Sequence, residues 1–289
     1  MWAVAVTALW GVNFVVIKWS MVDFPPFLLA SGRFAMCVLP WIFFVRRPAV
    51  SWASLVAFGA CGAGQFGLLF FALRADVSPG LASLLMQSQA FFTIGLSMVL
   101  RGERMKQLQY VALGLVVAGI ALIGWHAVSS GDGSITLIGL AMLLAGAMCW
   151  ALGNTVVRHA GRIDALGFLV WSSLFAVPPL FLLSLGFEGW DLITRSARAA
   201  TWVGWGGMLW QALANTLLGF GVWNWLLARY PAATVAPFSL LVPVFGMSAS
   251  TLFLGESLPL WKLAAAVLVM AGLALNVRAS RAGAPPVAP

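Results

Sequence analysis

The side chains best suited to chemistry in this sequence are neutral amides that lie within long apolar runs. These amides are Asn13, Gln65, Gln87, Gln89, Asn154, Gln211, Asn215 and Asn224. An amide surrounded by hydrocarbon costs free energy unless it finds a hydrogen-bond partner or lines a cavity that holds water. Each amide taken alone could simply join two neighbouring helices, but the set as a whole favours a polar cavity within a membrane.

Arg33 is the one basic side chain placed inside an apolar run, roughly eight residues or ~12 Å along a helix from Pro25. Its guanidinium could bind the carboxylate of a substrate. It could equally hold backbone carbonyls as a structural group, and the residues leave both roles open. No Asp or Glu lies deep within an apolar run. This disfavours a proton-coupled exporter of cations, which uses a carboxylate inside the membrane.

Aromatic side chains accompany these polar groups. Trp10 and Trp150 lie eight residues before Lys18 and Arg158, so each is expected at mid-depth, whereas most of the 15 tryptophans lie near span ends. Amides beside aromatic walls would suit a zwitterion with an apolar side chain, and a polyol nearly as well. The candidate substrate-binding residues are Trp10, Asn13, Phe14, Arg33, Gln65, Met86, Gln87, Phe91, Trp150, Asn154, Gln211, Asn215 and Ser239.

The composition places these residues in an all-α membrane protein. Of 289 residues, 62% are hydrophobic and 8% are charged, against roughly 25% charged in an ordinary soluble domain. The apolar runs are continuous, as helices require, and do not alternate as barrel strands do. Because a spanning helix needs ~20 residues, we expect ten transmembrane helices. Their approximate ranges are 2–20, 25–45, 52–73, 78–100, 107–124, 136–157, 165–186, 200–227, 232–254 and 260–277.

The basic residues predict the orientation of the chain. One side carries Arg46, Arg47, Arg101, Arg104, Lys106, Arg158, Arg162, Arg229, Arg278 and Arg281, and the other carries Lys18, Arg74, Arg195, Arg198 and Lys262. This excess predicts cytoplasmic N- and C-termini and residence in the cell's inner membrane. The net charge of +8 comes from basic residues placed one to three at a time between apolar runs. That spacing fits a lipid bilayer as partner rather than a nucleic acid.

The two halves of the chain resemble each other. Val116–Leu122 matches Val269–Leu275 at an offset of 153 residues, and at the same offset Gly102-Glu103 matches Gly255-Glu256. Five spans in each half make the second repeat inverted, as in secondary transporters with alternating access around a central cavity. We expect repeats at 1–128 and 135–280 and a disordered tail at 281–289.

Two local expectations follow from the repeat. The two glutamates are expected to cap the helices that begin after them. Pro243 has Ala90 as its counterpart, which predicts a straighter helix at 78–100 than at 232–254.

Enzymatic motifs are weak. His159 and Asp164 form an H-x4-D pattern known from membrane acyltransferases, but no other part of that signature is present, and phosphate-binding loops are absent. The three cysteines lack metal-ligand spacing. The sequence therefore predicts neither an enzyme nor a metal or other cofactor.

Short motifs along the whole chain resemble a known family. Trp10-Gly11-Val12-Asn13-Phe14, the Arg33-Phe34 pair and the two Gly-Glu linkers resemble the EamA family of the drug/metabolite transporter superfamily. The resemblance implies ten helices in two inverted repeats and the export of small metabolites. The nearest subgroup is that of YddG-type amino acid exporters, which includes exporters of aromatic amino acids.

The expected function is secondary export of amino acids, with neutral and aromatic ones favoured. A sugar, nucleotide-sugar or nucleobase carrier is the alternative within transport, and a membrane acyltransferase is the alternative outside it. Whether the protein is a monomer or a homodimer is left open by the sequence.

Overall fold

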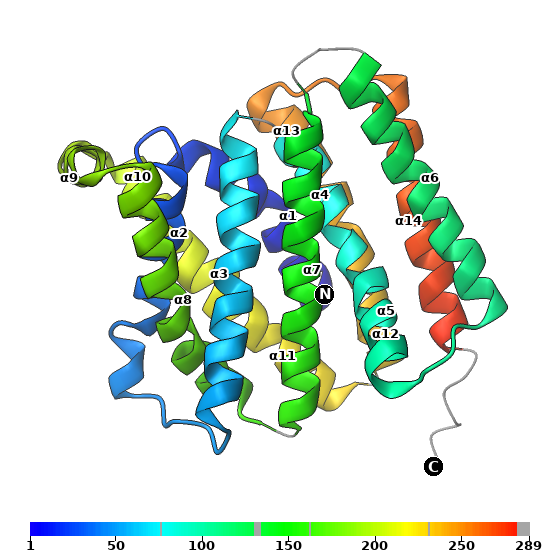
Figure 1. Cartoon of the computed structure of the whole chain (residues 1–289), viewed down its shortest axis with the longest axis horizontal. Coiled ribbons are helices and arrows are strands. Elements are labelled where there is room, and N and C mark those ends of the chain that lie inside the picture. The colour runs from blue at the N-terminus through cyan, green and yellow to red at the C-terminus, as the bar shows by residue number, and fades with distance from the viewer. Residues whose placement is uncertain (76, 130–133, 162, 231, 282–289) are drawn as a thin grey trace.

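The computed structural model describes residues 1–75, 77–129, 134–161, 163–230 and 232–281. In this part of the chain the secondary structure is helical apart from one isolated β-bridge between Val77 and Ile135. Of the tail predicted at 281–289, Arg281 is the last residue of the final helix, and residues 282–289 lie outside the described residues. Figure 1 shows a bundle of helices that run roughly alongside one another. The expected all-helical class is confirmed.

Nine helical segments of the described residues are long and apolar enough to cross a membrane. Most are single helices: α1 (Trp2–Ser20), α3 (Trp52–Ala75), α6 (Gln107–Ser129), α7 (Leu137–Ala160), α8 (Ala165–Phe187) and α14 (Leu260–Arg281). The others combine α2 (Pro26–Val38) with η1 (Trp41–Phe43), α4 (Pro79–Leu85) with η2 (Met86–Ser88) and α5 (Gln89–Arg101), and η4 (Ala236–Leu240) with α13 (Leu241–Leu254).

The segment expected at 200–227 is divided. It consists of α10 (Trp202–Trp210), the π-helix η3 (Gln211–Leu218) and α11 (Gly219–Arg229), which follow one another without a break. A π-helix of this length is rare, and such stretches occur frequently at functional sites. The sequence prediction of one ordinary helix here misses this change of helical type.

The helices expected at 78–100 and 232–254 are both interrupted, so Pro243 does not make the second one uniquely irregular, and their relative straightness stays a prediction. A 3-10 segment interrupts both, at Met86–Ser88 and, after α12 (Ala232–Val235), at Ala236–Leu240. At each interruption a serine hydroxyl donates to the carbonyl three residues earlier: Ser88 to Leu85 over 2.7 Å and Ser239 to Ala236 over 2.7 Å. Side-chain bonds of this kind compete with the regular helical pattern, so no proline is needed for the first interruption.

Helices α6 and α14 pack against each other and lie at one side of the bundle (Figure 1). Gly119 and Gly272 make this close approach possible. A Cβ atom added at Gly119 would collide with Val269, and one added at Gly272 would collide with Val116. Small residues at such contacts let helix backbones approach closely. The two helices therefore form a closely packed pair at the periphery of the bundle (Figure 1).

The stretch after α8, which lies between two expected spans, contains the short helix α9 (Trp190–Ala199). Figure 1 shows α9 end-on, so it runs across the direction of its neighbours. Ile193 is buried on one face, while Asp191 and Arg195 are exposed on the other. This amphipathic pattern stabilises a helix on a surface, and ten residues are too few to span a membrane.

Candidate substrate site

Arg33 lies on α2 and its side chain is completely buried. Its guanidinium carbon lies 3.8 Å from the ring centre of Phe66 and 5.4 Å from that of Phe34. Its Nη2 atom donates to the hydroxyl of Thr216, in η3, over 2.5 Å. The aromatic rings offer their negative faces to the cation, and among the described residues the Thr216 hydroxyl is its one hydrogen-bond acceptor.

Two further donors of Arg33, Nε and Nη1, are buried without a hydrogen-bond partner in the described part of the chain. The same holds for the Oδ1 atoms of Asn13 and Asn215 and the Oε1 atom of Gln211. An unsatisfied buried polar atom costs about 1–3 kcal/mol, and more when it belongs to a charged group. Such a set of donors and acceptors is what an occupying ligand would satisfy.

The π-helix η3 connects these groups, because α1 and α2 both pack against it. Thr216, which binds Arg33, also donates to the carbonyl of Gln211 over 2.7 Å. From α1, the indole Nε1 of Trp10 donates to the carbonyl of Asn215 over 3.1 Å. The Nε2 atom of Gln211 lies 3.4 Å from the hydroxyl of Ser20.

Aromatic rings extend this region along α11. The ring of Trp10 lies 5.2 Å from the ring centres of both Phe220 and Trp223. Asn13 and Phe14 follow Trp10 on α1 and both are buried. We call the region formed by Trp10, Asn13, Arg33, Gln211, Asn215 and Thr216 the η3 site.

A second group of candidates joins other helices. The Nδ2 atom of Asn154, on α7, donates to Oε1 of Gln89 over 3.1 Å, and Nε2 of Gln87 donates to the carbonyl of Ser239 over 3.3 Å. Each of these amides connects two helices directly. The remaining candidates take packing positions: Met86 and Phe91 are buried in the core, Gln65 is buried on α3, and Trp150 packs half-buried against the core.

Sequence reasoning missed several residues of the η3 site. Thr216 was not singled out, because residues five apart lie on the same face only in a π-helix, and an ordinary α-helix was expected here. Phe66 was missed because its contact with Arg33 depends on how α3 packs against α2. The thiol of Cys37, 3.6 Å from the carbonyl of Ala212, also lies here.

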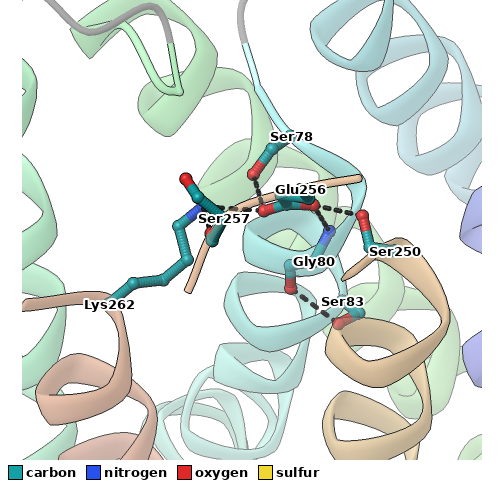
Figure 2. Close-up of polar contacts among 7 residues, drawn as sticks. All are labelled: Ser78, Gly80, Ser83, Ser250, Glu256, Ser257 and Lys262. Atoms are coloured by element: carbon teal, nitrogen blue, oxygen red, sulfur yellow. Dashed lines mark hydrogen bonds and ion pairs between the residues drawn. The ribbon is translucent and has the colours of Figure 1, made fainter. Parts of the chain in front are cut away.

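The largest omission is the set of contacts around Glu256 (Figure 2). Its carboxylate accepts hydrogen bonds from the hydroxyls of Ser78 (2.5 Å) and Ser250, from the backbone N–H of Gly80 (3.1 Å) and from the ammonium of Lys262 (2.8 Å). We call these five residues the Glu256 cluster. The expectation that Glu256 caps the helix after it is wrong, because the carboxylate binds the first turn of α4, some 176 residues earlier in the chain.

The H-x4-D residues have structural partners. His159 Nδ1 lies 2.9 Å from the carbonyl of Thr155. Asp164 caps α8 by accepting from the backbone N–H groups of Leu166 and Gly167. Both side chains are therefore engaged at helix ends in the way that ordinary terminal residues are.

Comparisons with known proteins agree with a transport role. The model of the EamA-like transporter family matches residues 1–125 and 137–278. A protein of Salmonella typhimurium named "Probable amino-acid metabolite efflux pump" is 41% identical over 95% of this chain and 93% of its own. A protein of Escherichia coli with the same name is 36% identical over the same shares of the two chains.

A solved crystal structure resembles the fold, with a TM-score of 0.57 and 18% identity over 96% of this chain and 99% of that one. Taken with the apolar helices, these findings identify a multi-pass membrane transporter and not an enzyme. The chain belongs to the EamA-like transporter family.

Proposed function

We propose that this protein is a secondary exporter of amino acids, with neutral and aromatic ones favoured, and that the η3 site binds them. The observation that carries this proposal is the buried, incompletely paired Arg33 beside unpaired amide oxygens. A substrate carboxylate would accept hydrogen bonds from Nε and Nη1 of Arg33. A substrate ammonium would donate to amide oxygens of the kind that Asn13, Gln211 and Asn215 leave unpaired.

The apolar side chain of such a substrate would have aromatic neighbours. The ring centres of Phe220 and Trp223 each lie 5.2 Å from that of Trp10. The names of the two bacterial relatives, both described as amino-acid metabolite efflux pumps, support the same substrate class. A neutral sugar or nucleobase would leave the Arg33 charge without a counter-ion, so those alternatives fit the site less well.

We further propose ten spans in two inverted repeats, at 1–128 and 135–280. Residues 202–229 add a tenth span to the nine described above, because 28 helical residues extend ~42 Å, which is long enough to cross a membrane. Gly102 (φ 66°, ψ 17°) and Gly255 (φ 67°, ψ 21°) end α5 and α13 in the same left-handed conformation, which supports the repeat. The excess of basic residues favours cytoplasmic termini in the inner membrane, and the inverted repeat favours alternating access.

The test is transport by purified protein in liposomes. We expect flux of phenylalanine, tryptophan, methionine or threonine with no imposed proton gradient, because no carboxylate lies within the spans. Arg33→Ala should abolish this flux and Arg33→Lys should reduce it, since an ammonium cannot form the paired bonds of a guanidinium. A matched control is Asn276→Ala, which removes a part-buried bond from Gln109 between α6 and α14, outside the η3 site.

Phenylethylamine, which lacks the carboxylate, should compete poorly with phenylalanine. Absence of flux for every amino acid, or full flux in folded Arg33→Ala, would overturn the proposal. Competition by sugars or nucleobases instead of amino acids would support the alternative carrier.

A further inference from the structure

The Glu256 cluster joins three helices at one end of the bundle. Ser78 and Gly80 belong to the start of α4, Ser250 to the last turn of α13, and Lys262 to the first turn of α14. Figure 2 shows the carboxylate between these elements, with its oxygens directed at partners on each side. One side chain thus connects the start of α4 to the junction between α13 and α14.

The cluster is largely closed to solvent. The side chain of Lys262 is 1% exposed and that of Glu256 is 10% exposed. Lys262 also donates to the carbonyl of Ser257 over 3.1 Å, so its charge is held by two acceptors. Hydrogen bonds to ionised groups are roughly twice as strong as neutral ones, and they are most effective where water is excluded.

Glu103 provides an internal comparison, because it occupies the matching position after the matching glycine. Its side chain is 53% exposed and its ion-pair partner is Arg158, at 3.7 Å, itself 50% exposed. Both line a cavity of about 200 Å³ together with Thr93 and Ser97. Under the proposed inverted topology the two glutamates lie at opposite membrane surfaces. One surface is therefore closed by a buried cluster, and the other is hollowed and solvated.

We propose that Glu256 is a positioning residue for transport: it holds the start of α4 against α13 and α14 and so keeps this end of the substrate pathway closed. The inference rests on the proposed alternating access. Opening this end requires α4 to leave the carboxylate, so the bonds of the cluster set the free energy of the closed state. A substrate shifts this equilibrium only by binding the two states differently.

Ser83 offers a reporter for the separation of α4 from α13. It is completely buried one turn after Gly80, and it lies so close to Gly246 of α13 that no Cβ atom would fit between them. A cysteine at this position becomes accessible to a water-soluble thiol reagent only when α4 moves away from α13. The native thiols Cys37, Cys61 and Cys149 are first replaced by alanine.

The experiment measures labelling of S83C by a membrane-impermeant maleimide, in intact cells and in inside-out vesicles. We expect Glu256→Gln to raise the labelling rate on the order of tenfold from the Glu256 side, because it removes the charge from the bonds to α4 and α14. Ser78→Ala should raise it less. Glu103→Gln, the matched control, should label at the parental rate.

Folded Glu256→Gln that labels at the parental rate would overturn the proposal, and so would an equal increase in Glu103→Gln. If Glu256→Gln is not recovered as folded protein, parental labelling in Ser78→Ala overturns it instead. Labelling requires no substrate. If no amino acid is transported but Glu256→Gln still labels faster than the parent, only the proposed substrate is rejected. If amino acids are transported but Glu256→Gln labels at the parental rate, only the role of Glu256 is rejected.

Discussion

The two Gly-Glu linkers have the same backbone and opposite surroundings. Gly102 and Gly255 differ by 1° in φ and 4° in ψ, and an added Cβ atom would contact nothing at either. Yet Glu256 is surrounded by partners from α4, α13 and α14, whereas Glu103 lies in solvent beside Arg158. The shared dipeptide specifies how a helix ends. The environment of its glutamate depends on which distant segment packs there.

The largest expected difference in stability is between variants of the two cations that pair with these glutamates, Lys262 and Arg158. Lys262→Met leaves the Glu256 carboxylate buried without its counter-ion, and we expect a loss of about 3–5 kcal/mol in the free energy of unfolding. Arg158→Met removes an exposed partner of Glu103 and should cost less than about 1 kcal/mol. Denaturant unfolding of both variants in detergent measures the difference, and equal losses would contradict it.

Removing both charges of the buried pair sharpens this comparison. Glu256→Gln combined with Lys262→Met should recover about half or more of the loss caused by Lys262→Met alone, since no uncompensated charge then remains. The carboxamide oxygen can still accept from the backbone of Gly80. Additive losses in the double-mutant cycle would show that the two side chains do not interact energetically.

The glycines should behave alike, in contrast to their glutamates. Gly102→Ala and Gly255→Ala each place a side chain in the left-handed region, at a cost of about 1–2 kcal/mol. Because neither site has a neighbour within 4 Å, no steric term should separate them. Thermal unfolding of the two variants tests this, with a clear difference between them as the contrary result.

The smallest expected effect is that of lowering the pH from neutral to mildly acidic, which should leave the Glu256 carboxylate ionised and its hydrogen bonds intact. Burial alone would raise the pKa of Glu256, but hydrogen bonds from Lys262, Ser250 and Ser78 and the charge of Lys262 outweigh it and lower the pKa. The carboxylate therefore stabilises the fold fully above its ordinary pKa of 4.5, and this contribution is lost only as the pH falls through the lowered value. The labelling rate of S83C, divided by that of a fully exposed cysteine to cancel the pH dependence of thiolate reactivity, should be constant from about pH 8 to pH 5. A rise within that range would mean that another group controls the opening.

Much of the fold follows from the sequence because spanning helices must satisfy their own backbone in an apolar medium. The charges that end each apolar run then mark where most helices begin and end. The short helix α9 and the serine-linked 3-10 segments were missed, because local side-chain bonding and amphipathicity produce them within otherwise ordinary stretches. The free energies that separate π, 3-10 and α turns are small, so the helical type of a segment of eight residues cannot be predicted from its sequence.

The site was predictable in its residue types and only partly in its grouping. The burial of Arg33 and the importance of Gln211 and Asn215 were expected, since such groups are costly in hydrocarbon. The division between the η3 site and the amides that join helices could not be foreseen, because Asn154 and Asn215 have the same chemistry and differ only in what their helices face. Glu256 shows the same limit, with partners such as Ser78 far away in the chain.

The π-helix η3 limits how the substrate site can change with sequence. A π-helix closes its hydrogen bonds over five residues, so it holds more chain per turn than an α-helix. Deleting one residue between Gln211 and Leu218 would let the segment return to α-helix and would remove its wide turns. The bond from the Thr216 hydroxyl to the Gln211 carbonyl, five residues earlier, would be lost with them, and Arg33 would lose its acceptor in its present position. Substitutions can adjust this site gradually, whereas an insertion or deletion here changes it in one discrete step.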